Sequence, residues 1–473
     1  MNSVPPELYV QWRAQQEALF LLHERDTPLP PERLLQTIWR HQRLQRDLLR
    51  TLDGQPLRIL HPGFWNREAG PDFRGAIVQF GSEEPLSGDI EVDVLPENWQ
   101  AHQHDRNPAF AGVILRVVWT AGRPASSAAP ALALREFLDM PVEDMQLWAA
   151  HSAAETWPDN LRGACSTPLA QLPPDRREAL LRQAALVRFQ RKARELENRA
   201  RQAGWEQALW EGIFRALGYK QNIWPMQRVA ELLPRLREGA PALLAWQARL
   251  LGISGFLTAA PPAAEGAEYA RALWDHWWRE RETFRAELLP RKIWRMNGLR
   301  PANQPQRRLA MAAHWLAAGD ILTRLETWFT AGPSPGLLPD TLLTCLQPPL
   351  DDFWSWHWSF TSPRQARPQP LLGESRATDL AINVILPWFW TRARAGKNDR
   401  LVLAAEERFL QWPQAQDNTL LRLARQRLLG GHTARLSSAA GQQGLLQIVH
   451  DFCDRSNALC AECTFPDLVR KYA

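Results

Sequence analysis

The sequence predicts an α+β protein in which a mixed α/β region is followed by a large, entirely helical region. Short β-prone runs separated by Gly, Pro and Asp fill residues 53–138, whereas apolar residues recur at helical spacing in most of the chain after residue 160. No segment repeats at a fixed period. We therefore expect an α/β domain at residues 1–160, a helical domain at 161–440 and a cysteine-containing segment at 441–473.

The individual elements follow from local patterns. Residues 32–39 are expected to form a helix, and strands are expected at 57–60, 76–80, 90–94 and 113–119. The third strand alternates, so that Glu91 and Asp93 share one face. Further helices are expected at 175–201, 205–218, 226–235, 240–251, 267–287, 307–329, 378–394, 401–411 and 418–429.

The composition is that of a globular protein with an unusual choice of basic residues. The chain has 473 residues, of which 45% are hydrophobic and 23% charged, and this excludes wholesale disorder. Five of the 56 basic residues are Lys, which leaves 51 Arg, and the net charge of +5 permits an acidic partner without requiring one. The first residues do not have the pattern of a signal peptide, and no apolar run is long enough to cross a membrane. We expect a cytoplasmic protein that does not bind membranes.

Acidic and histidine side chains gather around the second and third predicted strands. Asp72 precedes one strand, while Glu91 and Asp93 lie on the next, and carboxylates on adjacent strands can hold one Mg²⁺ or Mn²⁺. His102 and His104 follow closely and could transfer a proton or contact a phosphate. The alternative is an Asp in a turn, a solvent-facing strand and surface histidines.

This order of residues resembles the PD-(D/E)XK phosphodiesterase superfamily. In that family a helix precedes three strands, an Asp after Pro opens the second strand, and an acid-x-Lys motif lies on the third; here Pro71-Asp72 and Glu91-x-Asp93 occupy those places. The resemblance implies a restriction-endonuclease-like fold and metal-dependent cleavage of phosphodiesters. Asp93 stands where the family has Lys, and Arg74 or His102 could substitute for it.

A broader set of motifs resembles the bacterial family of unknown function numbered 2851. The motifs include His61-Pro62-Gly63, Gly70-Pro71-Asp72-Phe73, Gly88-Asp89-Ile90-Glu91-Val92, His102-Gln103-His104, Leu299-Arg300-Pro301-Ala302-Asn303 and Gln442-Gln443-Gly444-Leu445. The resemblance covers nearly the whole chain and brings no established activity. Two positions depart from the family pattern, because Asp93 replaces a His and Asn107 replaces an Asp. If those positions are catalytic, this member is altered or inactive.

The C-terminal cysteines form a second candidate metal site. Thiolates spaced as in Cys453-x6-Cys460-x2-Cys463 can surround one soft metal centre, either zinc or an iron–sulfur cluster. The spacing resembles the first three ligands of the iron–sulfur loop in endonuclease III-like DNA glycosylases. A fourth ligand could come from His450, Cys165 or Cys345, and the alternative is a set of buried free thiols.

The predicted helix at 175–201 carries a cluster of cations. Arg188, Arg191, Lys192 and Arg199 recur at three-, four- and seven-residue steps, so they could contact the phosphates of a nucleic acid. The alternative is a solvated helix face with local acidic partners.

These patterns lead to two hypotheses of function. The first is a metal-dependent nuclease in which Asp72 and Glu91 hold Mg²⁺ or Mn²⁺ and Asp93, His102 and His104 complete the catalytic site. The alternative is a catalytically inactive protein that binds nucleic acid or serves as a protein-interaction scaffold.

Overall fold

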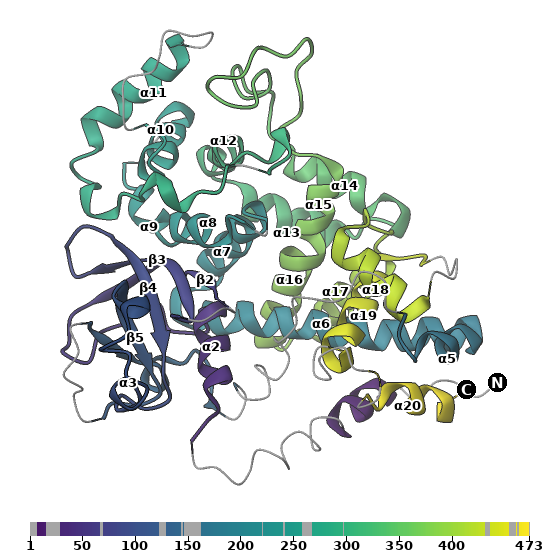
Figure 1. Cartoon of the computed structure of the whole chain (residues 1–473). Helices are drawn as coiled ribbons and strands as arrows, with labels where there is room; N and C mark the ends of the chain where they lie inside the picture. The colour runs from purple at the N-terminus through teal and green to yellow at the C-terminus, as the bar shows by residue number, and fades with distance from the viewer. Residues whose placement is uncertain are drawn as a thin grey trace.

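The computed structural model contains a mixed β-sheet with its helices, followed by a large helical region (Figure 1). It describes residues 7–15, 29–66, 70–122, 129–142, 145, 162–219, 221–239, 242–257, 267–296, 298–430, 436–453, 460 and 463–472. The predicted α+β class is confirmed. The predicted domain limits stay a prediction, and the first of them lies within residues 146–161, outside the described residues.

The sheet combines antiparallel and parallel pairing. Its strands are β1 (Leu57–His61), β2 (Phe64–Trp65), β3 (Phe73–Phe80), β4 (Leu86–Val92), β5 (Val113–Val118) and β6 (Ala131–Ala133). They are arranged in the order β1-β3-β4-β5-β6, with β2 also paired to β3. The pairs β1/β3 and β3/β4 are antiparallel, while β4/β5 and β5/β6 are parallel. The four predicted strands are present, but the third, expected at 90–94, is β4 and ends at Val92, so Asp93 directly follows it. Strands β2 and β6 span two and three residues, too few to show a period.

A glycine allows the close approach of β4 to β5. A Cβ at Gly88 would lie 2.3 Å from Ile114 Cγ2 and 2.7 Å from the carbonyl oxygen of Gly112, so only glycine fits there. Because β4 and β5 are parallel, the chain must cross over between them. This crossover carries helix α3 (Asn98–Ala101) and both predicted site histidines, and it therefore begins at the same end of β4 as the two acids.

Helices make up most of the rest of the chain. Besides α3 they are α2 (Glu32–His41), α5 (Ser166–Gln171), α6 (Pro174–Ala203), α7 (Trp205–Leu217), α8 (Ile223–Glu231), α9 (Leu233–Leu236), α10 (Leu243–Ile253), α11 (Ala267–Glu280), α12 (Pro305–Ala318), α13 (Ile321–Ala331), α14 (Leu338–Leu346), α15 (Glu374–Leu380), α16 (Leu386–Ala395), α17 (Asp399–Gln411), α18 (Thr419–Leu429), α19 (Ala439–Ile448) and α20 (Phe465–Tyr472). The predicted helices are present, several of them interrupted. The helix expected at 226–235 divides at Leu232 into α8 and α9, and the one expected at 267–287 ends at Glu280. Gly319, at φ 68°, ends α12, and residues 381–385 form a π-helical turn.

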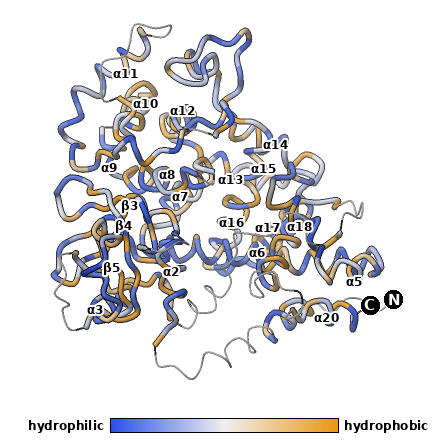
Figure 2. The backbone as a smooth tube through the Cα atoms, viewed as in Figure 1, coloured by the Kyte–Doolittle hydropathy of each residue, from blue (hydrophilic) through white to orange (hydrophobic). Residues whose placement is uncertain are grey.

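Three apolar clusters hold the molecule together, and the apolar segments of Figure 2 follow them. The first fills the helical region, and the second joins α2 to the sheet. The third contains side chains of α5, α6, α18, α19 and α20. Within the described part of the chain, no helix is long and apolar enough to cross a membrane.

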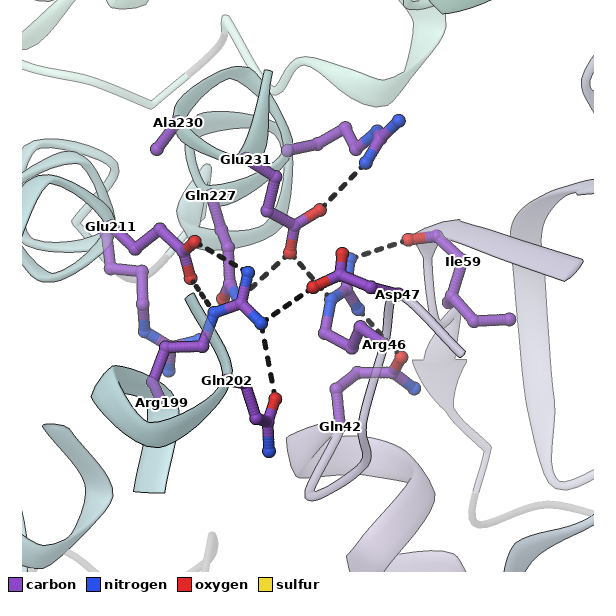
Figure 3. A network of polar contacts seen from close by, with 12 residues as sticks. Gln42, Arg46, Asp47, Ile59, Arg199, Gln202, Glu211, Gln227, Ala230 and Glu231 are labelled. Atoms are coloured by element: carbon purple, nitrogen blue, oxygen red, sulfur yellow. Dashed lines mark hydrogen bonds and ion pairs between the residues drawn. The ribbon is translucent and has the colours of Figure 1, made fainter. Parts of the chain in front are cut away.

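Ion pairs join the sheet to the helices (Figure 3). Arg46, which follows α2, donates to Glu231 at the end of α8 over 2.8 Å. Arg199 of α6 donates to Asp47 over 2.8 Å and, through two nitrogens, to both carboxylate oxygens of Glu211, also over 2.8 Å. Paired donors of this kind suit the planar guanidinium group and fix the orientation of both partners.

The structure predicts that Glu231→Gln destabilises the protein. The Glu231 side chain is 3% exposed, and although burial alone raises the pKa of its carboxyl, Arg46 and Arg228 lower it to about 2. Removing this charge leaves two guanidinium groups without their counter-ion, at a cost of about 3–5 kcal/mol in the free energy of unfolding. Urea unfolding measures the loss. The matched variant Glu282→Gln, in an ion pair whose carboxylate is 67% exposed, should change the same free energy by less than about 0.5 kcal/mol. Equal effects of the two variants would contradict the role given to this network.

Candidate functional site

The predicted acids converge at the ends of β3 and β4. Asp72 Oδ2 accepts a hydrogen bond of 3.0 Å from the backbone nitrogen of Val92. In return, Glu91 Oε2 accepts one of 3.2 Å from the backbone nitrogen of Asp72. These reciprocal bonds connect each carboxyl group to the backbone next to the other, and the charge of Asp72 raises the pKa of Glu91.

The loop before β3 holds Asp72 in place. The backbone nitrogen of Asn66 donates to the Asp72 carbonyl oxygen over 2.7 Å, and its side-chain nitrogen donates to that of Pro71 over 2.9 Å. Gly70 has φ +114°, a backbone conformation that favours glycine. The Gly-Pro-Asp sequence therefore forms a constrained turn that presents its carboxylate.

Helix α2 adds two residues that the sequence did not single out. Gln36 donates to Asp72 Oδ1 over 2.9 Å and to Glu32 Oε1 over 2.8 Å. The charge of Glu32 also raises the pKa of Asp72, Glu91 and Asp93. Residues four positions apart on a helix share a face, so the pairing of Glu32 with Gln36 is visible in the sequence, whereas its position beside the strands is not.

The two histidines lie side by side against the acids. Gln103 between them has φ 57°, a backbone conformation that residues other than glycine seldom adopt. The ring centroids of His102 and His104 lie 5.3 Å apart across this turn. His102 Nδ1 lies 3.6 Å from Asp93 Oδ1, and His104 Nε2 lies 3.4 Å from Glu91 Oε1. The segment is a strained turn rather than the extended one that would also align both rings.

Aromatic side chains support His104. Its ring centroid lies 3.9 Å from that of Phe110 and 5.3 Å from that of Trp99. Burial lowers the pKa of His104, so the imidazole is neutral near pH 7, which is the form that binds metals. His102 is 52% exposed and lies on the solvent side of the pair.

Asp93, His102 and His104 together can hold a metal ion. One ligand atom from each residue lies within 4.8 Å of the others. The Asp93 side chain is 2% exposed, and its Oδ2 has no hydrogen-bond partner among the described residues. A buried carboxylate oxygen without a partner is costly, and a cation would satisfy it. This mixture of carboxylate and imidazole suits Mn²⁺, iron or zinc, while the adjacent Asp72 and Glu91 add hard oxygen ligands that also suit Mg²⁺.

The acids hold protons more tightly than ordinary carboxyls. Burial raises the pKa of Asp72 to about 7, that of Glu91 to about 9 and that of Asp93 to about 6. Mutual repulsion adds to burial, because the charges of Asp72 and Asp93 both raise the pKa of Glu91. A cation in this space would therefore compete with protons.

Arg116 of β5 is the cation next to the site. Its side chain lies over the Trp99 ring, at 5.4 Å from the centroid, and its charge lowers the pKa of Asp93. It is 3% exposed, and its Nε and Nη1 make no hydrogen bond within the described residues. Asp93 stands where the PD-(D/E)XK motif has Lys, and His102 and Arg74 are the residues expected to substitute for that Lys. His102 lies beside Asp93, whereas Arg74 is exposed.

The comparisons with known proteins identify the family. A family model described as "Protein of unknown function (DUF2851)" matches residues 32–418, most of the chain. The chain belongs to this family. No curated protein and no solved structure matches. The family match begins at Glu32 and includes every acid and histidine of the site. Asn107, which departs from the family pattern, accepts a hydrogen bond of 3.0 Å from the backbone nitrogen of Ala109, a capping role that Asp can also fill.

The predicted cationic face of α6 is covered by other parts of the molecule. Its members are half-buried and donate to partners within the chain. Arg191 contacts His450 Nε2 at 2.7 Å, and Lys192 Nζ donates to Asn383 and Gln443 over 2.5 and 2.9 Å. Arg188 also donates to Gln443, over 2.9 Å, and Arg199 makes the ion pairs of Figure 3. The expectation of an open face at these four positions is corrected, since other elements of the chain supply partners to all of them. Contact with nucleic acid there stays a prediction that requires these bonds to open.

The structure distinguishes among the three candidates for a fourth ligand to the cysteines. Cys165 belongs to the same apolar cluster as Cys453, against which Cys463 packs. His450 Nδ1 instead lies 3.2 Å from Asp451 Oδ1, and Cys345 packs against the main helical core. Cys165 is therefore the candidate that the fold places beside the others.

The raised pKa values predict that the metal-free protein loses stability as pH rises. An acid whose folded pKa exceeds its unfolded value of about 4 stabilises the fold fully below that value. That stability is lost as pH passes about 6 for Asp93, about 7 for Asp72 and about 9 for Glu91. Thermal unfolding in EDTA between these pH values measures the loss. Glu91→Gln, which keeps a neutral side chain, should show a smaller fall in Tm between pH 7 and pH 9 than the exposed-site control Glu84→Gln. Parallel profiles of the two variants would contradict the assignment.

Proposed function

We propose that this protein is a metal-dependent phosphodiesterase that hydrolyses nucleic acid at the site formed by Asp72, Glu91, Asp93, His102 and His104. The observation that carries the proposal is the set of Asp93, His102 and His104 ligand atoms within 4.8 Å, with a buried Asp93 oxygen that has no hydrogen-bond partner among the described residues. The order of a helix with Glu32, an Asp before β3 and Glu91 on β4 supports a likeness to PD-(D/E)XK phosphodiesterases.

The acids and histidines divide into ligands and proton-transfer groups. Asp93, His102 and His104 would hold the ion, with Asp72 and Glu91 beside it. A divalent ion bound there lowers the pKa of a water molecule and stabilises negative charge on a phosphate group. Glu91, whose pKa lies at about 9, and the adjacent His104 can exchange a proton at the same place. Arg116 contributes a positive charge that acts on Asp93, the residue that stands where the PD-(D/E)XK family has Lys.

Exposed cations near the site support a polyanionic substrate. Arg106 follows the two histidines with its side chain 82% exposed. Arg74 is also exposed, and its Nη2 lies 3.1 Å from the place that a Cβ on Gly70 would occupy. Arg74 lies beside the turn that presents Asp72, and Arg106 follows the histidines in the chain, so both could contact the phosphates of a substrate bound at the site.

The first prediction is that Mn²⁺ binds and stabilises the protein. At a concentration of about 100 times the Kd, Mn²⁺ should raise the free energy of unfolding by about 2.7 kcal/mol. The gain should be larger at pH 8.5 than at pH 6, because protons compete for acids with pKa values of about 6, 7 and 9. Calorimetric titration measures the affinity. Asp93→Asn should weaken it at least about tenfold while Glu84→Gln leaves it unchanged, and equal affinities would exclude Asp93 as a ligand.

The second prediction concerns turnover. Labelled single- and double-stranded DNA and RNA, incubated with the protein and Mg²⁺ or Mn²⁺, should be cleaved in one or more forms. Asp72→Asn and Asp93→Asn should each lower the rate by about 10²-fold or more, as expected for groups that act on the transition state, whereas Glu84→Gln should not. Salt-sensitive binding without cleavage by the wild type would favour the inactive nucleic-acid-binding alternative. Absence of both binding and cleavage would favour the protein scaffold.

A further inference from the structure

Three C-terminal cysteines and one that lies almost 300 positions earlier in the sequence come together beside α18. Cys165 immediately precedes α5, Cys453 ends the π-helical turn at Val449–Cys453, and Cys460 and Cys463 precede α20. Cys165 and Cys463 are almost 300 positions apart, yet α5 packs against both α18 and α20. None of the five described cysteines is in a disulfide.

Direct contacts connect the four positions. Cys460 Sγ accepts a hydrogen bond of 3.3 Å from the backbone nitrogen of Ala164, the residue before Cys165. The backbone nitrogen of Cys463 donates to the carbonyl oxygen of Cys460 over 3.3 Å. Cys165 and Cys453 are 4% and 6% exposed and belong to one apolar cluster. The sulfurs also affect one another, because after burial the largest influences raising the pKa of Cys453 are the charges of Cys165 and Cys463.

A buried arginine points at the sulfurs. Arg427 of α18 is 4% exposed and donates from Nη2 to Cys460 Sγ over 3.1 Å. It also forms a hydrogen bond with Cys453; burial raises the pKa of the Cys165, Cys453 and Cys463 thiols, and the charge of Arg427 opposes that rise. Its carbonyl oxygen accepts from the backbone nitrogen of Gly163 over 2.9 Å, which brings the Cys165 loop to the same place.

We propose that Cys165, Cys453, Cys460 and Cys463 bind a [4Fe–4S] cluster. Four thiolates are the ligand set of such clusters, and the hydrogen bonds from Arg427 and Ala164 to sulfur are of the kind that stabilises them. The surroundings are apolar, since Cys165 and Cys453 belong to the third apolar cluster and Cys463 packs against it.

The spacing of the sulfurs distinguishes this cluster from a single zinc ion. Zinc at about 2.3 Å from each of four sulfurs holds them about 3.8 Å apart at the corners of a tetrahedron. Among the described residues, the group of three or more ligand atoms that lie mutually within 4.8 Å is that of Asp93, His102 and His104, so no three of the four cysteine sulfurs come that close to one another. A cubane with four irons separates its thiolates further than one ion does.

The cluster would connect the start of the helical region to the end of the chain. Cys165 belongs to the segment that leads into α6, whereas Cys463 precedes the last described helix. Closing this long loop restricts the unfolded chain, so the cluster should stabilise the packing of α5, α18 and α20. The site uses none of the residues of the acid–histidine site and is independent of the proposed phosphodiesterase activity.

The full-length protein, purified without oxygen, tests the proposal. Iron and acid-labile sulfide should each be present at about four per chain, with the visible absorption of an iron–sulfur protein, either as purified or after reconstitution with ferrous iron and sulfide. Cys165→Ser and Cys460→Ser should each lose most of the iron and the visible absorption. The matched variant Cys345→Ser, at a half-buried cysteine in the main helical core, should retain both.

Several outcomes would overturn the proposal. One zinc per chain in place of iron would exclude the cluster, and absence of any metal after reconstitution would exclude the site. Full iron content in Cys165→Ser would exclude the fourth ligand. Circular dichroism and Mn²⁺ affinity of each variant show that it is folded, because the Mn²⁺ ligands lie in the sheet part of the molecule.

Discussion

Helix α6 carries cations that are only partly exposed to water. The packing of several other elements depends on supplying partners to these cations. A half-buried cation loses hydration, so a neighbouring element must supply an acceptor or a counter-charge. Asn383 and Gln443 supply acceptors to Lys192, and Asp47 supplies a charge to Arg199. These acceptors come from the π-helical turn before α16, from α19 and from the segment after α2. The packing of all three against α6 therefore has a polar component that fixes their register, in addition to apolar burial.

Helix α6 also relates the two candidate metal sites in space. Its 30 residues span about 45 Å, and one end adjoins α5 while the other carries Arg199, which pairs with the sheet part of the chain (Figures 1 and 3). The acid–histidine site lies in the sheet and the cysteines lie beside α5 and α18. The two candidate sites lie near opposite ends of α6, so they can have different roles. The acid–histidine site would serve catalysis, and the cysteine site would hold the C-terminal segment to the start of the helical region.

Local patterns predicted what neighbouring residues determine, and did not predict what long-range packing determines. Alternation in the sequence predicted that Glu91 and Asp93 share one face, and Asp93 directly follows β4. The spacing of Cys460 and Cys463 predicted a metal motif. The sequence did not single out Glu32, and it did not decide between Cys165 and the other two candidates for a fourth ligand. Each of these two residues reaches its site from an element that is distant in sequence. The cations of α6 show the converse. Periodicity shows which side chains share a face, but it does not show whether another helix covers that face.

The cluster of Asp72, Glu91 and Asp93 is energetically unfavourable if its role is purely structural. Burial and mutual repulsion raise the pKa of Glu91 and Asp93 to about 9 and about 6, so in the metal-free protein their ionisation opposes folding near neutral pH. Asn and Gln would make similar hydrogen bonds without that cost. Asp93 Oδ2 has no hydrogen-bond partner among the described residues, and the adjacent turn contains Gln103 at positive φ. Strain, a buried carboxylate oxygen without a hydrogen-bond partner among the described residues and two neighbouring imidazoles would together be accounted for by a cation, which would neutralise the acids and use the histidines as ligands.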